Sequence, residues 1–187
     1  MNLPAPGPVF LSRDARWRLL AATGVALVVV TYLAEGCFPG LFARDLPPAD
    51  RVVVWKADRR LTLYSRDDAI ATYSISLGTN PVGHKTWQGD SRTPEGLYTL
   101  DYRNPDSQFY HAIHVSYPDE DDLAAAIEAD VPAGGDIMIH GLPNGRGWIG
   151  PLYKLRDWTD GCISVTNREM EEIWRAVPDG TPIEINP

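Results

Sequence analysis

The alternation of apolar and polar residues predicts a series of short β-strands from Arg51 onward. The runs Val52–Lys56 (VVVWK) and Leu61–Ser65 (LTLYS) flank the polar stretch ADRR, and this arrangement indicates a β-hairpin. The remaining strands are expected in Ala69–Gly78, Leu97–Arg103, His111–Tyr117, Gly134–His140 and Thr181–Ile185. The pattern is typical of a mostly antiparallel β domain.

Two segments depart from this alternation and predict short helices. Asp119–Asp130 is apolar in its second half and acidic in its first turn, where the helix dipole favours negative charge. A second helix is expected after Thr166, because Thr166 and Glu169 have the spacing of a capping box. Apolar residues then recur along one helical face at Met170, Ile173, Trp174 and Val177.

Two long loops interrupt the domain, Thr79–Gly96 and Gly141–Asp157. Both are dense in glycine, and each carries two prolines. Loops of this length without secondary structure are uncommon in compact domains and are usually functional. We therefore expect the chemistry of the protein to lie beside them.

The N-terminal part of the chain has a different pattern. Three arginines precede the uncharged apolar run Leu19–Ala34, which as a helix would reach about 24 Å. A bilayer core is roughly 30 Å thick, so the run suits a signal peptide or a marginal membrane anchor, with lipidation of Cys37 and a buried helix as further alternatives. Residues 1–37 are thus expected to be a signal or anchor, 38–50 a linker and 51–187 the folded domain.

Charge and cysteine content bear on the class of partner and on the state of the thiols. The net charge of −8 argues against a nucleic-acid partner, because phosphate contacts need basic surfaces. The arginines before the apolar run place the rest of the chain outside the cytoplasm, where cysteines are usually paired. The sequence has only Cys37 and Cys162, so Cys162 is expected to be a free thiol in an oxidising compartment.

A free thiol beside a glycine suggests a nucleophile. His140 ends a predicted strand and is a candidate base for Cys162. The alternative is that both are structural, with Cys162 a small buried apolar residue and His140 a hydrogen-bonded residue at the end of its strand. Gly141 and Gly161 would let a substrate approach the backbone, and the N–H groups of Gly161 and Cys162 are candidate oxyanion donors. No metal or cofactor is expected, because no compact ligand spacing exists among His84, His111, His114 and His140.

The segment IHGLPNGRGWIGPLYKLRDWTDGCISVTN resembles the active-site signature of the L,D-transpeptidase catalytic domain family. That signature is His-Gly, a loop, Ser/Thr-His-Gly-Cys and a short run to Asn, and it is matched here by His140, Gly141, Thr159, Gly161, Cys162 and Asn167. The family's Thr-Pro-x-Gly segment is matched by Thr93, Pro94 and Gly96. Two positions depart from the signature, since Asp160 replaces its second histidine and Ser164 replaces an arginine.

The resemblance implies a mixed β-sandwich with two short helices and an enzyme with Cys162 as nucleophile and His140 as base. The substrates would be peptidoglycan stem tetrapeptides, and the acceptor a second stem peptide or a protein lysine, on the periplasmic or cell-wall side. Hydrolysis of stem peptides or protein–wall links is the alternative reaction, and a non-catalytic peptidoglycan-binding module is the alternative of another class. Supporting or substrate contacts are expected from Gly141, Thr159, Asp160, Asn167, His84 and Thr93.

Overall fold

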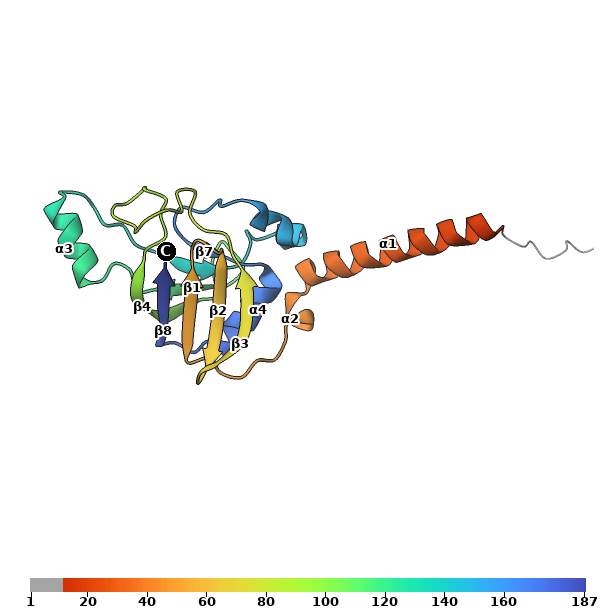
Figure 1. Ribbon diagram of the computed structural model, residues 1–187, viewed down its shortest axis with the longest axis horizontal. Coiled ribbons are helices and arrows are strands. Elements are labelled where there is room, and N and C mark those ends of the chain that lie inside the picture. Colours follow the sequence, from red (N-terminus) through yellow and green to blue (C-terminus); the bar gives the residue numbers. More distant parts are fainter. Residues whose placement is uncertain (1–11) are drawn as a thin grey trace, which may run out of the picture.

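A computed structural model describes residues 12–187 and shows a β domain from which one long helix extends (Figure 1). The domain is built on one eight-stranded sheet, in the order β3-β2-β1-β8-β4-β5-β6-β7. The strands are β1 (Arg51–Trp55), β2 (Arg60–Ser65), β3 (Asp68–Ser74), β4 (Gly96–Asn104), β5 (Ala112–Val115), β6 (Met138–His140), β7 (Ile163–Ser164) and β8 (Thr181–Asn186). The helices are α1 (Arg13–Cys37), α2 (Pro39–Phe42), α3 (Glu120–Glu128), α4 (Asn167–Ala176) and the 3-10 helix η1 (Gly147–Leu155).

The expected β-sandwich is corrected to a single curled sheet. The C-terminal strand β8 pairs in parallel with β1 and antiparallel with β4, so it joins the two halves of the sheet into one. The predicted hairpin of β1 and β2 is confirmed, with Val52 opposite Leu63. A second parallel pair, β6 and β7, lies at the edge of the sheet opposite β3.

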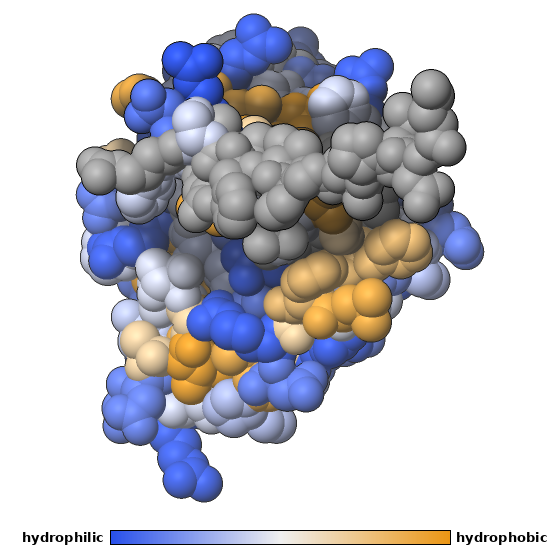
Figure 2. Space-filling model, turned by 90° about the vertical axis from the view of Figure 1, so that its right-hand side faces the viewer, coloured by the Kyte–Doolittle hydropathy of each residue, from blue (hydrophilic) through white to orange (hydrophobic). Residues whose placement is uncertain are grey.

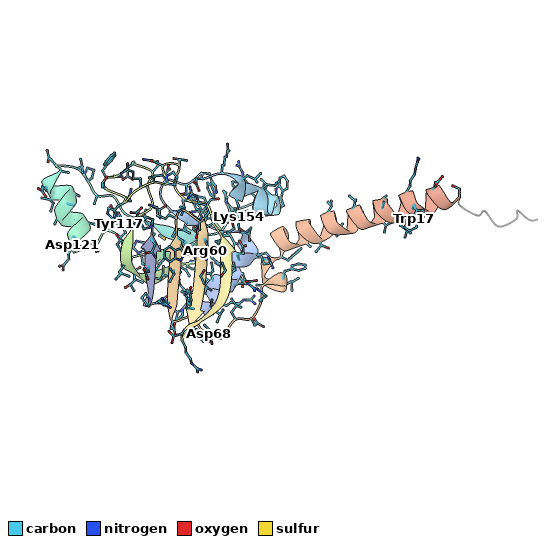
Figure 3. The ribbon with its side chains drawn as sticks, viewed as in Figure 1. Trp17, Arg60, Asp68, Tyr117, Asp121 and Lys154 are labelled. Atoms are coloured by element: carbon cyan, nitrogen blue, oxygen red, sulfur yellow. The ribbon has the colours of Figure 1, made fainter. Side chains whose placement is uncertain are left out.

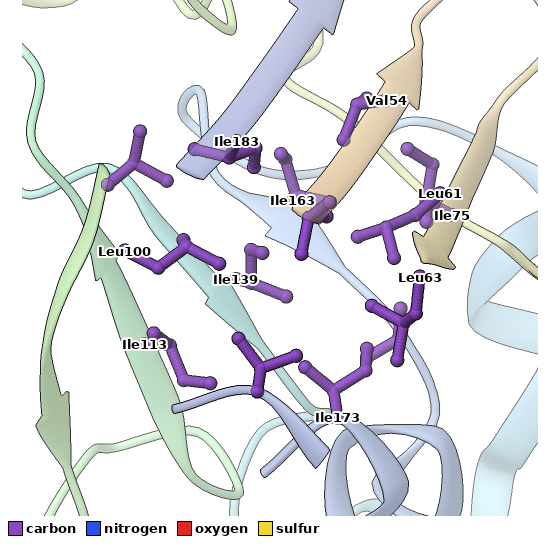
Figure 4. Packing of buried hydrophobic residues seen from close by; sticks show 14 of the residues in the cluster. Val54, Leu61, Leu63, Ile75, Leu100, Ile113, Ile139, Ile163, Ile173 and Ile183 are labelled. Atoms are coloured by element: carbon purple, nitrogen blue, oxygen red, sulfur yellow. The ribbon is translucent and has the colours of Figure 1, made fainter. Parts of the chain in front are cut away.

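The core lies between the curled sheet and α4. Figure 4 shows side chains from strands on both sides of β8 meeting there, including Leu63, Leu100 and Ile163. Met170 and Ile173 of α4 are fully buried against them. Burying one such side chain stabilises the fold by roughly 1.5–3 kcal/mol, so this cluster is the main source of stability.

The two predicted helices of the domain are confirmed, together with their capping. Thr166 accepts a hydrogen bond from the Glu169 N–H, and the Glu169 side chain accepts from Thr166 in return. Asp119 and Asp122 form the equivalent box at α3. The helix η1 lies inside the predicted loop Gly141–Asp157, and its kink at Gly150 has a positive φ of 51°.

The helix α1 contains the apolar run Leu19–Ala34 and points away from the domain (Figure 1). Among the described residues, no helix combines the length and apolar composition that a membrane span requires. The side chain of Cys37, the lipidation candidate, lies outside what the structure describes. The end of α1 packs closely on η1, because a Cβ added to Gly36 would lie 2.5 Å from the Cα of Trp148.

The segment 38–50, expected to be a linker, contacts the domain. Arg44 donates to the buried carboxylate of Glu172 from its backbone N–H and its guanidinium, and Tyr73 donates to the same carboxylate at 2.9 Å. Burial opposes ionisation of Glu172, but the hydrogen bonds from Arg44 and Tyr73 and the charge of Arg44 together outweigh it, and the pKa of this carboxyl lies below its usual value. Arg44 therefore belongs to the packed structure.

Replacing Arg44 by alanine is expected to lower the free energy of unfolding by about 2–4 kcal/mol, because it leaves the Glu172 charge buried with fewer partners. The pKa of Glu172 is lower in the folded state, so this contribution is present at neutral pH and is lost as the pH falls through the carboxyl range. Urea unfolding at neutral pH measures it. Arg175→Ala is the control, since Arg175 pairs at the surface and should cost about 1 kcal/mol or less. Equal losses in the two variants would contradict the account.

Candidate active site

The parallel pairing of β6 and β7 brings the predicted nucleophile and base together. Ile139 lies opposite Ile163, and His140 lies opposite Ser164. Side chains alternate between the two faces of a strand, so Cys162, two residues before Ser164, shares a face with His140. Both side chains line one pocket of about 360 Å³. Its walls also include Phe109, Asp136 and Met138.

The surroundings of His140 determine which of its ring nitrogens can accept a proton. Nδ1 lies 2.6 Å from the backbone carbonyl oxygen of Gly141. A carbonyl oxygen only accepts, so Nδ1 must carry the hydrogen and Nε2 is left with its lone pair. Phe109 packs against the imidazole at a centroid distance of 4.2 Å, and the edge of Trp158 approaches it at 5.7 Å. The ring is therefore fixed in both orientation and tautomer.

The protonation states of the pair follow from burial. The His140 side chain is only 2% exposed, and burial lowers its pKa to about 4, although the bond to Gly141 acts in the opposite direction. Cys162 is half-buried, and burial raises the pKa of its thiol, while the nearby carboxylates of Asp160 and Asp136 raise it further. At neutral pH the pair thus rests as a thiol and a neutral imidazole.

Hydrogen bonds to the backbone orient the thiol. The Cys162 Sγ lies 3.6 Å from the carbonyl oxygen of Asp136, which accepts its hydrogen. The N–H of Met138 donates to the sulfur and favours the thiolate, because it stabilises negative charge there. Asp136 lies just before β6 and Met138 begins it, so the segment that ends in His140 also holds the thiol.

A tight turn precedes Cys162, the predicted nucleophile. The Thr159 hydroxyl donates to the carbonyl oxygen of Cys162 at 2.7 Å and accepts from the Gly161 N–H at 3.3 Å. The backbone of Thr159 also bonds to Leu77 and Thr79 in the segment that follows β3. The Gly161 N–H already has a partner in this turn, which leaves the Cys162 N–H as the candidate oxyanion donor of the two expected.

Replacing Gly161 by alanine is expected to destabilise the protein by about 2–4 kcal/mol. Gly161 has a φ of +123°, and an added Cβ would lie 2.6 Å from the carbonyl oxygen of Arg92. Urea denaturation measures the loss. Gly89→Ala is the matched control, because Gly89 also has a positive φ but has no atom within 4 Å of an added Cβ. A Gly161→Ala variant as stable as the control would show that the close approach costs nothing.

The structure gives the other signature residues supporting roles around this pair. Asn167 is buried at the start of α4, and its Oδ1 accepts from the Leu142 N–H at 2.8 Å. Gly141 lies against it, since an added Cβ would meet the Asn167 Oδ1 at 2.9 Å. Asp160 is exposed, and its carboxylate lies 3.4 Å from the Ser91 hydroxyl. Asn167 therefore holds the loop after His140, whereas Asp160 acts on the thiol through its charge.

His84 and Thr93 lie in the long polar loop and serve its structure. The Nδ1 of His84 accepts from the Glu95 N–H at 3.0 Å, and its Nε2 contacts Asp122 at 2.8 Å. Thr93 is fully buried, and its hydroxyl accepts from the Gly78 N–H at 3.4 Å. Within residues 12–187, no group of three or more His, Cys, Asp or Glu side chains is arranged to hold a metal ion.

Sequence reasoning missed the aromatic wall of the site. Phe109 and Trp158 lie far apart in the sequence but meet at 5.9 Å between ring centroids, and both contact His140. Trp158 stands four residues before Cys162, which was the only available signal. Phe109 had none, because it lies in an irregular segment before β5.

Comparison with known proteins decides the family. Residues 49–185, which include both His140 and Cys162, match the family model of the L,D-transpeptidase catalytic domain, YkuD. The chain belongs to the L,D-transpeptidase catalytic domain family. Its curled sheet and few helices match the L,D-transpeptidase fold, and the resemblance inferred from the signature is confirmed.

Three known proteins are similar to this chain over much of its length. YafK of Escherichia coli is 29% identical over 132 residues, which cover 67% of this chain and 46% of YafK. A variant of the helical cell shape determining protein Pgp2 from Campylobacter jejuni has a TM-score of 0.54 at 26% identity, covering 76% of this chain and 48% of that one. Bd1075 of Bdellovibrio bacteriovorus has a TM-score of 0.51 at 25% identity, covering 75% and 53%. The chain thus spans about half the length of these relatives.

Proposed function

We propose that this protein is a cysteine-dependent L,D-transpeptidase that acts on peptidoglycan stem tetrapeptides. The observation that carries the proposal is the shared pocket of Cys162 and His140, in which the bond from Nδ1 to Gly141 leaves Nε2 as the proton acceptor. Membership of the family and the cell-shape role in the name of Pgp2 support the choice of substrate.

The proposed reaction uses the two residues in both halves. Nε2 of His140 takes the proton from the Cys162 thiol as the sulfur attacks the carbonyl carbon between the diamino acid and the terminal D-alanine. The C–N bond breaks, the imidazolium protonates the departing amine, and a thioester remains. The N–H of Cys162 is the proposed donor to the oxyanion. An acceptor amine then gives a proton to Nε2 as it attacks the thioester carbon. The C–S bond breaks, and the imidazolium returns the proton to the departing sulfur.

Product analysis tests this function. The full-length chain is incubated with purified tetrapeptide muropeptides, and the products are identified by mass, with Cys162→Ser as the control. Dimers formed with loss of D-alanine are the expected result. Free tripeptides would instead indicate a carboxypeptidase or hydrolase, and binding without any product would indicate a wall-binding module.

The pH dependence of acylation is expected to be flat between about pH 5.5 and 7, because the pKa of His140 lies at about 4 and the imidazole is already neutral across this range. The rate should fall only as the pH drops toward that value and the base becomes protonated. Single-turnover acylation at each pH measures this. A half-maximal rate near pH 6.5, the ordinary histidine value, would contradict the buried neutral imidazole.

We also propose that the domain works on the cell-wall side after export, with the apolar run Leu19–Ala34 as signal peptide or membrane attachment. The support is the row of arginines before the run and a substrate that lies outside the cytoplasm. Cell fractionation tests the location. Full-length chain found only in the cytosol would contradict the proposed export.

A further inference from the structure

The segment from Arg146 to Arg156, RGWIGPLYKLR, combines exposed apolar side chains with basic residues. Within it, η1 exposes Trp148, Leu152 and Leu155 by 52, 61 and 80%. Leaving a leucine in water instead of burying it is unfavourable by roughly 1.5–3 kcal/mol. Three such side chains on one short helix indicate a surface that has a partner.

This surface continues onto neighbouring elements. Phe38 and Leu41, at α2, are 62% and 80% exposed, and α2 follows directly after α1. The end of α1 packs on η1 through Gly36, so all three elements lie at the same end of the domain (Figure 1). Figure 2 looks at this end and shows hydrophobic groups between hydrophilic ones. We call the surface made by Phe38, Leu41, Trp148, Leu152 and Leu155 the α1-side face.

Basic residues border the α1-side face although the protein as a whole is acidic. Arg146 and Arg156 stand at the two ends of η1 and are exposed, whereas Lys154 between them is ion-paired with Glu169 (Figure 3). The chain carries a net charge of −8, so two exposed arginines on one short helix contrast with the acidic protein as a whole. Tryptophan and leucine bordered by arginine is the composition of segments that lie in the interface of a membrane.

We propose that the α1-side face rests on the surface of a phospholipid bilayer, with its apolar side chains at the acyl-chain boundary and its arginines among anionic headgroups. The described part of α1 favours lipid over a second copy of the chain. It projects from the base of this face with Leu20, Val25 and Val29 exposed (Figure 1). An extended apolar medium covers both the projecting helix and the face at its base, whereas a folded partner would have to match both shapes. Because η1 lies between His140 and Cys162 in the chain, this contact would hold the catalytic loop beside the membrane.

A fluorescent label sensitive to polarity tests the contact. The full-length chain carrying Cys37→Ser and Cys162→Ser receives a single labelling site, Leu155→Cys, and an NBD label. The control is Ile127→Cys, since Ile127 is 78% exposed on α3 at the opposite end of the domain (Figure 1). Both proteins are mixed with vesicles of phosphatidylcholine containing a minority of phosphatidylglycerol, and the bound fraction is recovered by flotation. Thermal unfolding of both variants is compared with the parent to verify the fold.

The label at position 155 is expected to shift to the blue, brighten severalfold and be quenched by brominated lipids, while the label at position 127 does not change. Arg146→Gln combined with Arg156→Gln should weaken the response on phosphatidylglycerol vesicles. Three results would overturn the proposal: no flotation, a label at position 155 that stays in water on bound protein, or a shift that appears without vesicles as the concentration rises, which would assign the face to a second copy. The readout does not depend on turnover, so its failure leaves the proposed function untouched.

Discussion

Replacing Cys162 by serine is expected to reduce the release of D-alanine from stem tetrapeptides to background while leaving the fold intact. The change removes no hydrogen-bonding group, but a hydroxyl is far less acidic and less nucleophilic than a thiol. The half-buried site adds to this difference, because burial already opposes the charged form of the thiol. D-alanine release and thermal unfolding, measured on the same preparation, separate lost chemistry from lost structure.

Cys37→Ser is the matched control for this substitution. Cys37 ends α1 and lies outside residues 49–185, which match the family model. Its replacement should leave the rate unchanged. A Cys162→Ser protein that turns over tetrapeptide near the parental rate would contradict the covalent mechanism. Equal inactivation by the two substitutions would indicate that the two cysteines act together.

Replacing His140 by glutamine is expected to slow both acylation and deacylation by about 10²–10⁴-fold, the usual contribution of a general acid–base group. Glutamine keeps a polar side chain of similar reach, but it cannot accept the thiol proton and return it to the leaving amine. Because Nε2 serves both half-reactions, each should slow. Rapid mixing with a tetrapeptide, followed by mass analysis of the protein over time, measures the two rates separately.

Two other substitutions show whether His140 is the right base. His114→Gln should have little effect, because His114 bonds to Asp101 at 2.7 Å, stacks on Tyr102 and is not among the residues that line the pocket. Asp160→Asn removes a carboxylate that raises the pKa of the thiol, so it should not slow acylation as His140→Gln does. If Asp160→Asn proved the slower of the two, the base would have been assigned to the wrong residue.

Local patterns made most of the secondary structure predictable. The hairpin of β1 and β2 followed from alternating apolar residues around a polar turn, and the capping box of Thr166 and Glu169 correctly gave the start of α4. Cys162 and His140 could each be selected as candidates because each lies beside a glycine at a predicted strand end. Such features depend on neighbours in the sequence, which is why reading the sequence was sufficient.

Features that depend on distant contacts could not be predicted. The sandwich expectation failed because β8 inserts between β1 and β4, a pairing that no local pattern encodes. The tautomer of His140 depends on the geometry of one carbonyl group at Gly141. The packing of Arg44 onto Glu172 joins residues that are 128 positions apart, and this turned an expected linker into part of the folded structure.

The acyl-enzyme itself is the most direct test of the central claim. The full-length chain is mixed with a stem tetrapeptide, quenched in acid after a short time, and its intact mass and labelled peptide are determined. The account predicts one adduct with the mass of the tetrapeptide less D-alanine, located on Cys162 and absent from Cys162→Ser. Turnover of the tetrapeptide with no adduct at any quench time, or an adduct that persists in Cys162→Ser, would contradict it.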